Sequence, residues 1–162
     1  MNPNFQNQAE TILESLGKIL GFDQLEFDTD DDTCLLVLDG EIEIAVTLNE
    51  ENSELILHHQ IGTLPERNRY DIVERLLEAN LFWSGTRGAT LSMERTTGVV
   101  IIAKAVGLYD TDGVLLTGEE LGSAIVNLAE VATHWGKLLG SDASEEASTT
   151  RKVESMIGKM FA

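Results

Sequence analysis

The sequence predicts an α+β domain in which helices pack on an antiparallel β-sheet. Apolar residues recur at helical spacing near the start, in the middle and towards the end of the chain, and alternate in the segments between. Short turns containing Gly join neighbouring strand-like segments, and such short connections favour antiparallel pairing. We therefore expect the order helix, three or four strands, helix, two strands, helix.

The first helix is predicted to end near Gly21, where the helical apolar pattern stops. Leu25 and Phe27 alternate with polar residues and predict a short strand. The acidic run Asp28–Asp32 departs from the EF-hand pattern, because Thr33 and Asp39 stand where Gly and Glu are required, so we expect an exposed turn. The apolar stripe of the helix contains Phe5, Ala9, Ile12, Leu13, Leu16, Ile19 and Leu20.

The next strands form a hairpin around Asp39-Gly40, because Asp-Gly between two β-rich runs is a strong hairpin signal. In its second strand Ile42, Ile44 and Val46 alternate with more polar neighbours, so one face of this strand is expected to be buried. The predicted strands are Thr33–Leu38, Glu41–Leu48 and Glu54–Ile61.

A second helix is predicted from Pro65 to Phe82. Thr63 and Glu66 are spaced as a capping box, and Pro65 falls in the first turn. Trp83 follows, where its ring either covers the sheet edge or reaches a second subunit. A second hairpin then turns at Thr96-Thr97-Gly98. Its strands are predicted at Ala89–Arg95 and Val99–Val106.

The last helix of the domain is predicted to begin at a second capping box, Thr117 with Glu120, and to stop near Gly140. Ser141–Thr150 is rich in Ser, Ala and acids and predicts a flexible linker. A short amphipathic segment follows, with Val153, Met156, Ile157, Met160 and Phe161 at helical spacing. We expect one domain over residues 1–140 and an extension over 141–162.

Composition limits the partners. The chain has 162 residues, 43% of them hydrophobic, and a formal net charge of −17 from 11 basic and 28 acidic residues. Nucleic acid and anionic membranes bind proteins through Lys and Arg, so neither is expected as a partner. The charge either serves solubility alone or attracts a basic or aggregation-prone partner.

No targeting or redox signal is evident. Met1-Asn2-Pro3-Asn4 lacks the features of a signal peptide, and no apolar run approaches the ~20 residues needed to span a bilayer. Cys34 is the only cysteine, so no internal disulfide is possible. We expect a cytoplasmic protein.

The residue pattern offers no active site. His58 and His59 are adjacent in a predicted strand, so they point to opposite faces and cannot share a metal. Cys34 lies in an apolar strand, where a buried inert thiol is expected. We predict no catalytic residue, no metal and no cofactor. A small acidic regulatory or enzymatic domain of the same α+β shape remains the alternative to a binding protein.

One stretch resembles a known family. Leu76–Phe82, a Gly-bearing loop, Gly88–Met93 and Gly98–Val100 are similar to the class I type III secretion chaperones, the Tir-chaperone family. The resemblance implies a bacterial cytoplasmic chaperone, working without ATP, whose homodimer holds the N-terminal segment of a secreted effector in extended form. A contact with the secretion ATPase is an open alternative.

Two sets of residues follow from this resemblance. The partner-binding surface is expected near the first helix and neighbouring strands, at Ile12, Leu13, Leu16, Ile19, Leu20, Leu25, Phe27, Ile42, Ile44 and Val46. The dimer interface is expected around the second helix and the following strand, at Leu76, Leu77, Leu81, Phe82, Trp83, Leu91 and Met93.

Overall fold

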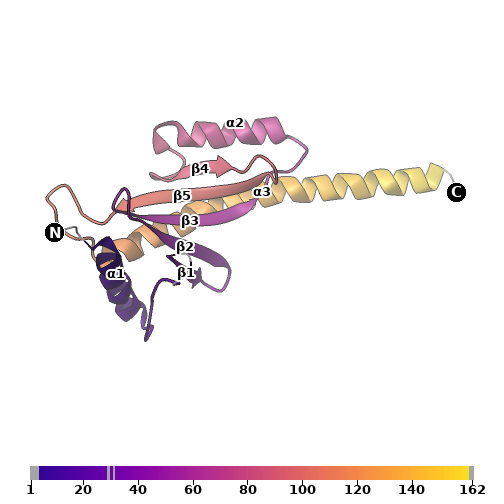
Figure 1. Ribbon diagram of the computed structural model, residues 1–162. Helices are drawn as coiled ribbons and strands as arrows, with labels where there is room; N and C mark the ends of the chain where they lie inside the picture. The colour runs from indigo at the N-terminus through magenta and orange to yellow at the C-terminus, as the bar shows by residue number, and fades with distance from the viewer. Residues whose placement is uncertain (1–3, 29, 31, 161–162) are drawn as a thin grey trace.

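A five-stranded antiparallel sheet forms the centre of the computed structural model, which describes residues 4–28, 30 and 32–160, with side chains up to residue 140. Thr29, Asp31 and Phe161, named above, lie outside the described residues. In chain order (Figure 1) the elements are α1 (Phe5–Leu20), β1 (Thr33–Leu38), β2 (Ile42–Asn49), β3 (Glu54–Thr63), α2 (Arg69–Asn80), the 3-10 turn η1 (Leu81–Trp83), β4 (Thr90–Met93), β5 (Val99–Gly107) and α3 (Gly118–Met160). The predicted α+β class and element order are confirmed.

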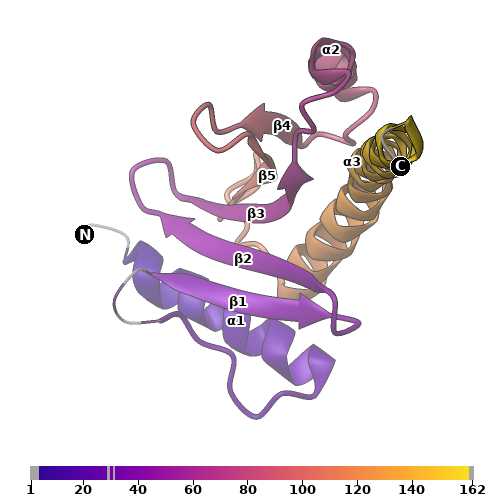
Figure 2. The same cartoon turned by 90° about the vertical axis from the view of Figure 1, so that its right-hand side faces the viewer.

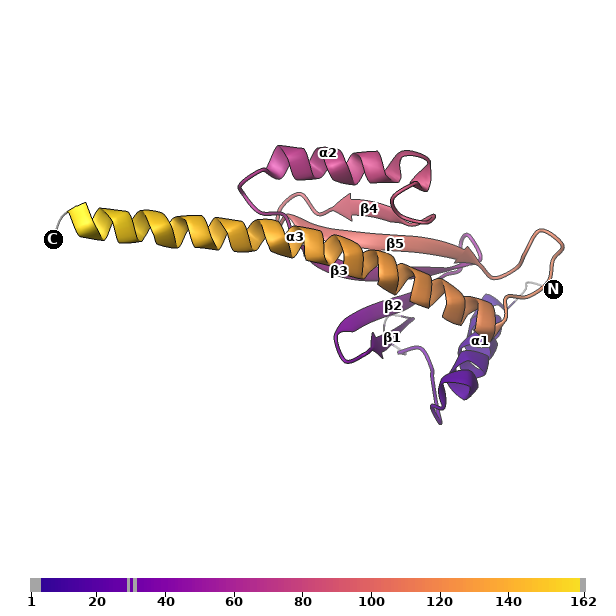
Figure 3. The same cartoon turned by 180° about the vertical axis from the view of Figure 1, so that it is seen from behind.

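The sheet order is β1-β2-β3-β5-β4, so β1 and β4 are the two edges. Helix α3 lies diagonally across one face, in contact with β2, β3 and β5, and packs against α1 at its beginning (Figure 3). Helix α2 stands beside β4, at the opposite edge from β1 (Figure 2). The helices α1 and α3 therefore share one side of the sheet, and the other side faces solvent.

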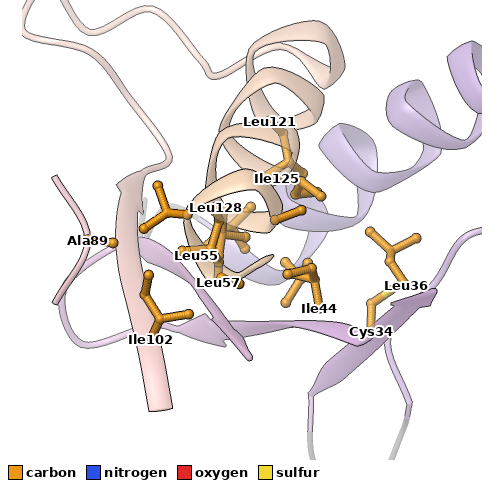
Figure 4. Close-up of a cluster of buried hydrophobic side chains, with 14 of the residues drawn as sticks. Cys34, Leu36, Ile44, Leu55, Leu57, Ala89, Ile102, Leu121, Ile125 and Leu128 are labelled. Atoms are coloured by element: carbon orange, nitrogen blue, oxygen red, sulfur yellow. The ribbon is translucent and has the colours of Figure 1, made fainter. Parts of the chain in front are cut away.

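The core lies between the sheet and α3. Ile44, Leu57 and Ile102 have no exposed surface and face Leu121 and Leu128, which are at most 1% exposed (Figure 4). Burying a side chain of this size is worth about 1.5–3 kcal/mol. This contact between the strands and α3 is the main source of cohesion in the described domain.

Both predicted hairpins are present, and their turns show why. Asp39 and Gly40 have φ values of 52° and 72°, and the Glu41 N–H donates to the Leu38 carbonyl at 3.1 Å, so these two residues occupy the central positions of a tight turn that needs positive φ. In the second hairpin Gly98 has φ of 72°, and the Glu94 carboxylate accepts hydrogen bonds from the backbone N–H groups of Thr96 at 2.8 Å and Thr97 at 2.6 Å. Local sequence fixes these two turns.

The capping box at the start of α3 is confirmed. The Glu120 carboxylate accepts from the Thr117 N–H at 2.8 Å, and the Thr117 hydroxyl accepts from the Glu120 N–H at 3.2 Å. The end of this helix differs from the prediction, since α3 does not stop near Gly140 and residues 141–150 are helical instead of a flexible linker. Ala and Glu favour a helix, and no Pro interrupts them. The division into residues 1–140 and 141–162 remains a prediction.

One predicted strand is absent, and the predicted start of the second helix is wrong. No strand forms at Leu25 and Phe27, because no neighbouring strand lies beside them. The second helix starts at Arg69, not at Pro65. Thr63 is still part of β3, paired with Val99, and the Leu64 N–H donates to the Gly98 carbonyl at 2.9 Å, so this backbone belongs to the sheet and cannot cap a helix.

Candidate functional site

Helix α1 divides into a buried middle and an exposed end. Ile12, Leu13 and Leu16 are at most 1% exposed, whereas Ile19 is 58% and Leu20 is 47% exposed. The close approach of α3 explains this division. A Cβ at Gly118 would lie 2.5 Å from the Leu16 backbone nitrogen, so the two helices nearly touch there. The end of α1 extends beyond this crossing.

The other residues predicted to bind a partner divide in the same way. Phe27 is 7% exposed, and Ile44 and Val46 have no exposed surface. Leu25 and Ile42 are half-buried. Six of the ten predicted residues therefore pack the core of this chain and leave little or no side-chain surface for a partner, which corrects their assignment to an exposed site. They are Ile12, Leu13, Leu16, Phe27, Ile44 and Val46.

A groove of about 580 Å³ separates the exposed side of α1 from the loop that follows it. Gly17 makes the near approach of this loop possible, since a Cβ there would lie 3.0 Å from the Leu25 Cβ. Lys18 pairs with Glu14 at 2.8 Å, and this hydrogen bond lowers the pKa of the Glu14 carboxyl. We call this hollow the α1 groove; its lining is Glu10, Glu14, Gly17, Lys18, Phe22, Asp23, Gln24, Leu25, Glu26 and Phe27.

Sequence reasoning missed three exposed apolar residues near the α1 groove and the β1 edge. Phe22 is 52% exposed, and Leu35 and Val37 are 57% and 53% exposed on the outer face of β1. The sequence carried a signal for the latter two, because β1 is apolar at successive positions and one of its two faces must be less covered. A strand edge flanked by apolar side chains is a template for an added strand.

The region predicted to form a dimer also separates into core and surface. Leu76 and Leu91 are each 5% exposed and belong to the core. The other five predicted residues, together with the unpredicted Tyr70, form the α2 surface. Its exposed fractions are Tyr70 86%, Leu77 64%, Leu81 59%, Phe82 86%, Trp83 56% and Met93 37%.

Backbone strain coincides with the α2 surface. Phe82 and Trp83 have φ values of 52° and 54°, a left-handed conformation that costs a non-Gly residue of order 1–3 kcal/mol. The adjoining Asn80 side chain bonds both backbone groups of Leu91 in β4, which holds the end of α2 against the sheet. The strained turn therefore holds two large aromatic rings exposed at the surface.

The histidines and the cysteine predicted to have no catalytic role lie apart from one another or within the sheet in the described part of the chain. Within the described chain no group of three or more His, Cys, Asp or Glu is arranged to hold a metal ion. His59 bonds the Glu43 carbonyl through Nδ1 at 2.6 Å, and His58 lies 3.5 Å from the Thr47 hydroxyl. Cys34 is 3% exposed, and burial raises the pKa of its thiol. These groups serve the packing and pairing of the sheet.

Among the described helices, none has both the length and the apolar character that crossing a bilayer demands.

Comparison with known proteins identifies the family. The sequence profile of the Tir chaperone protein (CesT) family matches residues 11–136, from the second turn of α1 to the last core turns of α3. The chain belongs to this family. A search of curated protein sequences returns no significant match. As the family consists of chaperones, the surfaces above are candidate sites of a chaperone.

Solved structures share the fold of this chaperone. The HopA1-SchA chaperone–effector complex is 17% identical, covers 82% of this chain and 95% of its own, and has a TM-score of 0.65. The ExsC-ExsE complex is 20% identical, covers 83% and 95%, and has a TM-score of 0.66. The ExoU-SpcU complex of Pseudomonas aeruginosa type III secretion is 20% identical, covers 79% and 97%, and has a TM-score of 0.60.

Proposed function

We propose that this chaperone binds the N-terminal segment of a secreted effector in extended form and keeps it soluble and competent for type III secretion. The observation that carries the proposal is the exposure of apolar side chains at the end of α1 and on the outer face of the edge strand β1. Chains of the same fold occur in the HopA1-SchA complex, which is described as a chaperone–effector complex, and in the ExoU-SpcU complex of a type III secretion system. These complexes support the class of partner.

The geometry suits an extended polypeptide better than a small molecule. Strand β1 has a single neighbour in the sheet, so its other side offers main-chain hydrogen bonds to an added strand. Ile19, Leu20 and Phe22 are exposed at the end of α1 and just after it, and they offer apolar contacts worth about 1.5–3 kcal/mol for each fully buried side chain. Part of that gain is lost in ordering the bound segment. Binding of this kind needs no ATP and depends only weakly on salt.

We also propose a homodimer formed through the α2 surface. The apolar side chains of this surface lie at the β4 edge of the sheet, away from β1. Symmetric pairing of one such surface with its copy is the usual way in which a soluble chain covers it. The effector site and the dimer interface then lie at opposite edges of the sheet. No contact with the secretion ATPase follows from the described surfaces.

The test uses substitutions on the exposed residues, because Leu16 and Ile44 are buried and their replacement by Asp would unfold the domain. Ile19→Asp with Leu35→Asp should reduce capture of the native effector at least tenfold. Val126→Asp is the matched control, since Val126 is 52% exposed on α3. The bound polypeptide is identified by mass spectrometry after co-purification from the native host, and circular dichroism confirms that the variants are folded. Wild-type capture by the double variant would place the effector elsewhere.

A further inference from the structure

The last part of α3 projects from the domain. Leu139, 3% exposed, is the last core residue among the side chains that are described, which end at residue 140, and the helix continues to Met160. At 1.5 Å per residue, the remainder adds roughly 30 Å of helix. Figures 1 and 3 show no other element beside it. A helix of this length is marginal alone in water, so its sequence must show what stabilises it.

The projecting part has two different halves. Residues 141–150 have small, polar or acidic side chains and offer no apolar stripe. On a regular helix, Val153, Met156, Ile157 and Met160 fall within an arc of about 100°. Residues 151–160, which we call the C-terminal arm, therefore form an amphipathic segment carried away from the domain by a polar spacer.

The charge of the arm differs from that of the rest of the chain. The last twelve residues hold three of the 11 basic residues of the protein, Arg151, Lys152 and Lys159, against one acid, Glu154. Its docking site must therefore combine apolar surface with negative charge. The α1 groove has this character, with the exposed Phe22 beside four acids and a single Lys.

We propose that the C-terminal arm docks in the α1 groove of a second copy of this chain. Its own groove is out of reach of a straight helix, because α1 and the end of α3 lie at opposite ends of the molecule (Figure 1). An anionic membrane is disfavoured as the occupant, since the net charge of −17 opposes approach of the whole protein to it. A neighbouring copy supplies the acidic groove, and the apolar stripe of the arm covers Phe22.

Docking would give the effector site a removable cover. Phe22 lies on the surface proposed for the effector, so an effector must displace the arm before it binds. This consequence rests on the proposed function, whereas docking of the arm does not. The apolar surface near α1 would be covered while no effector is present, which lowers its tendency to aggregate.

The experiment is site-directed cross-linking between two differently tagged full-length chains that are co-expressed without effector. One chain carries Met160→Cys, and the other carries Gln24→Cys in the α1 groove. The native Cys34 stays, since it is buried and burial raises its pKa. Disulfide-linked heterodimer should form at least fivefold more with Gln24→Cys than with Glu51→Cys, an exposed control in the turn between β2 and β3. Equal yields would overturn the proposal, as would a higher yield with Leu77→Cys on the α2 surface.

A charge exchange in the same assay distinguishes docking from chance collision. Lys152→Glu with Lys159→Glu in the arm should lower the yield about fivefold, and so should Asp23→Lys with Glu26→Lys in the groove. Combining the arm pair in one chain with the groove pair in the other should restore at least half of the cross-linking yield. Glu50→Lys in the control turn should leave the yield unchanged. Absence of rescue would contradict the assigned contact. Since no effector is present, the outcome is independent of the effector-binding test.

Discussion

The Asn80 side chain forms two hydrogen bonds to the backbone of Leu91. Its Nδ2 donates to the Leu91 carbonyl and its Oδ1 accepts from the Leu91 N–H, both at 2.9 Å. Asn80 thus replaces the missing strand on the outer side of β4, at the point where α2 ends. One amide thereby joins the two elements of the proposed dimer interface.

Replacing Asn80 by Ala should destabilise the protein by about 1–3 kcal/mol, because both half-buried backbone groups lose their partner. Asn80→Asp keeps the acceptor and loses the donor, so its stability should be lower than that of the native protein. Urea unfolding measures both changes. If Asn80→Ala unfolds at the same urea concentration as the native protein, water replaces the amide with no loss of stability, and the prediction is wrong.

Changing Gly118 to Ala should destabilise the crossing of α1 and α3. The added methyl group would lie 2.5 Å from the Leu16 backbone nitrogen, so the helices must move apart. Overpacking of this kind costs roughly 1–3 kcal/mol. Gly140→Ala is the matched control, since nothing lies within 4 Å of the position that its added methyl group would take. In thermal unfolding only the first variant should melt earlier.

Glu94 should make the second hairpin sensitive to acid. Hydrogen bonds from Thr97 and Thr96 lower the pKa of the Glu94 carboxyl to about 2. Because the folded pKa lies below the ordinary value, the carboxylate stabilises the fold above pH ~4.5, and this contribution is lost as the pH falls towards 2. The melting temperatures of the native protein and Glu94→Gln should therefore differ most at neutral pH and converge near pH 2. If the difference in melting temperature stayed constant between neutral pH and pH 2, the Glu94 carboxylate would not be the source of the acid sensitivity.

Leu77→Asp should convert the proposed homodimer into a monomer. Leu77 is 64% exposed, so the charge disturbs the α2 surface without entering the core of one chain. Light scattering should give about twice 17.7 kDa for the native chain and 17.7 kDa for the variant. Tyr109→Asp, at an exposed position away from α2, should remain dimeric. A native chain of 17.7 kDa at micromolar concentration would refute the dimer.

Removing residues 141–162 should leave the domain folded. Up to residue 140, where the described side chains end, the last core residue of α3 is Leu139, and the backbone beyond it lies beside no other described element. The melting temperature of the truncated chain should stay within a few degrees of the native value. A loss of several degrees would show that the C-terminal arm contributes to folding.

Local signals in the sequence predicted the fold well. Asp39-Gly40 and the Thr117 capping box determine their own structures through φ angles and short hydrogen bonds, so both were predictable without knowledge of the rest of the chain. The start of α2 was not predictable in this way, because pairing of Thr63 with Val99 extends β3 into the apparent capping box of Thr63 and Glu66. This pairing joins residues far apart in sequence, which local spacing does not show.

The candidate site was less predictable for a related reason. Periodicity identified the apolar stripe of α1 but not the point at which α3 crosses it. That crossing buries Leu16 and leaves Ile19 exposed, although both belong to the same stripe. Which apolar residues remain for a partner therefore depends on the packing of two elements at opposite ends of the sequence.

The contact of Gly118 with α1 also determines when the molecule is complete during synthesis. Helix α1 precedes the sheet in the sequence, but the helix that fixes its position follows all five strands. A chain that ends before residue 118 has α1 and all five strands but lacks α3, which covers most of their inner face. Contacts of such large sequence separation form late in folding. Within the described fold, a truncated translation product therefore lacks the helix that fixes the position of α1.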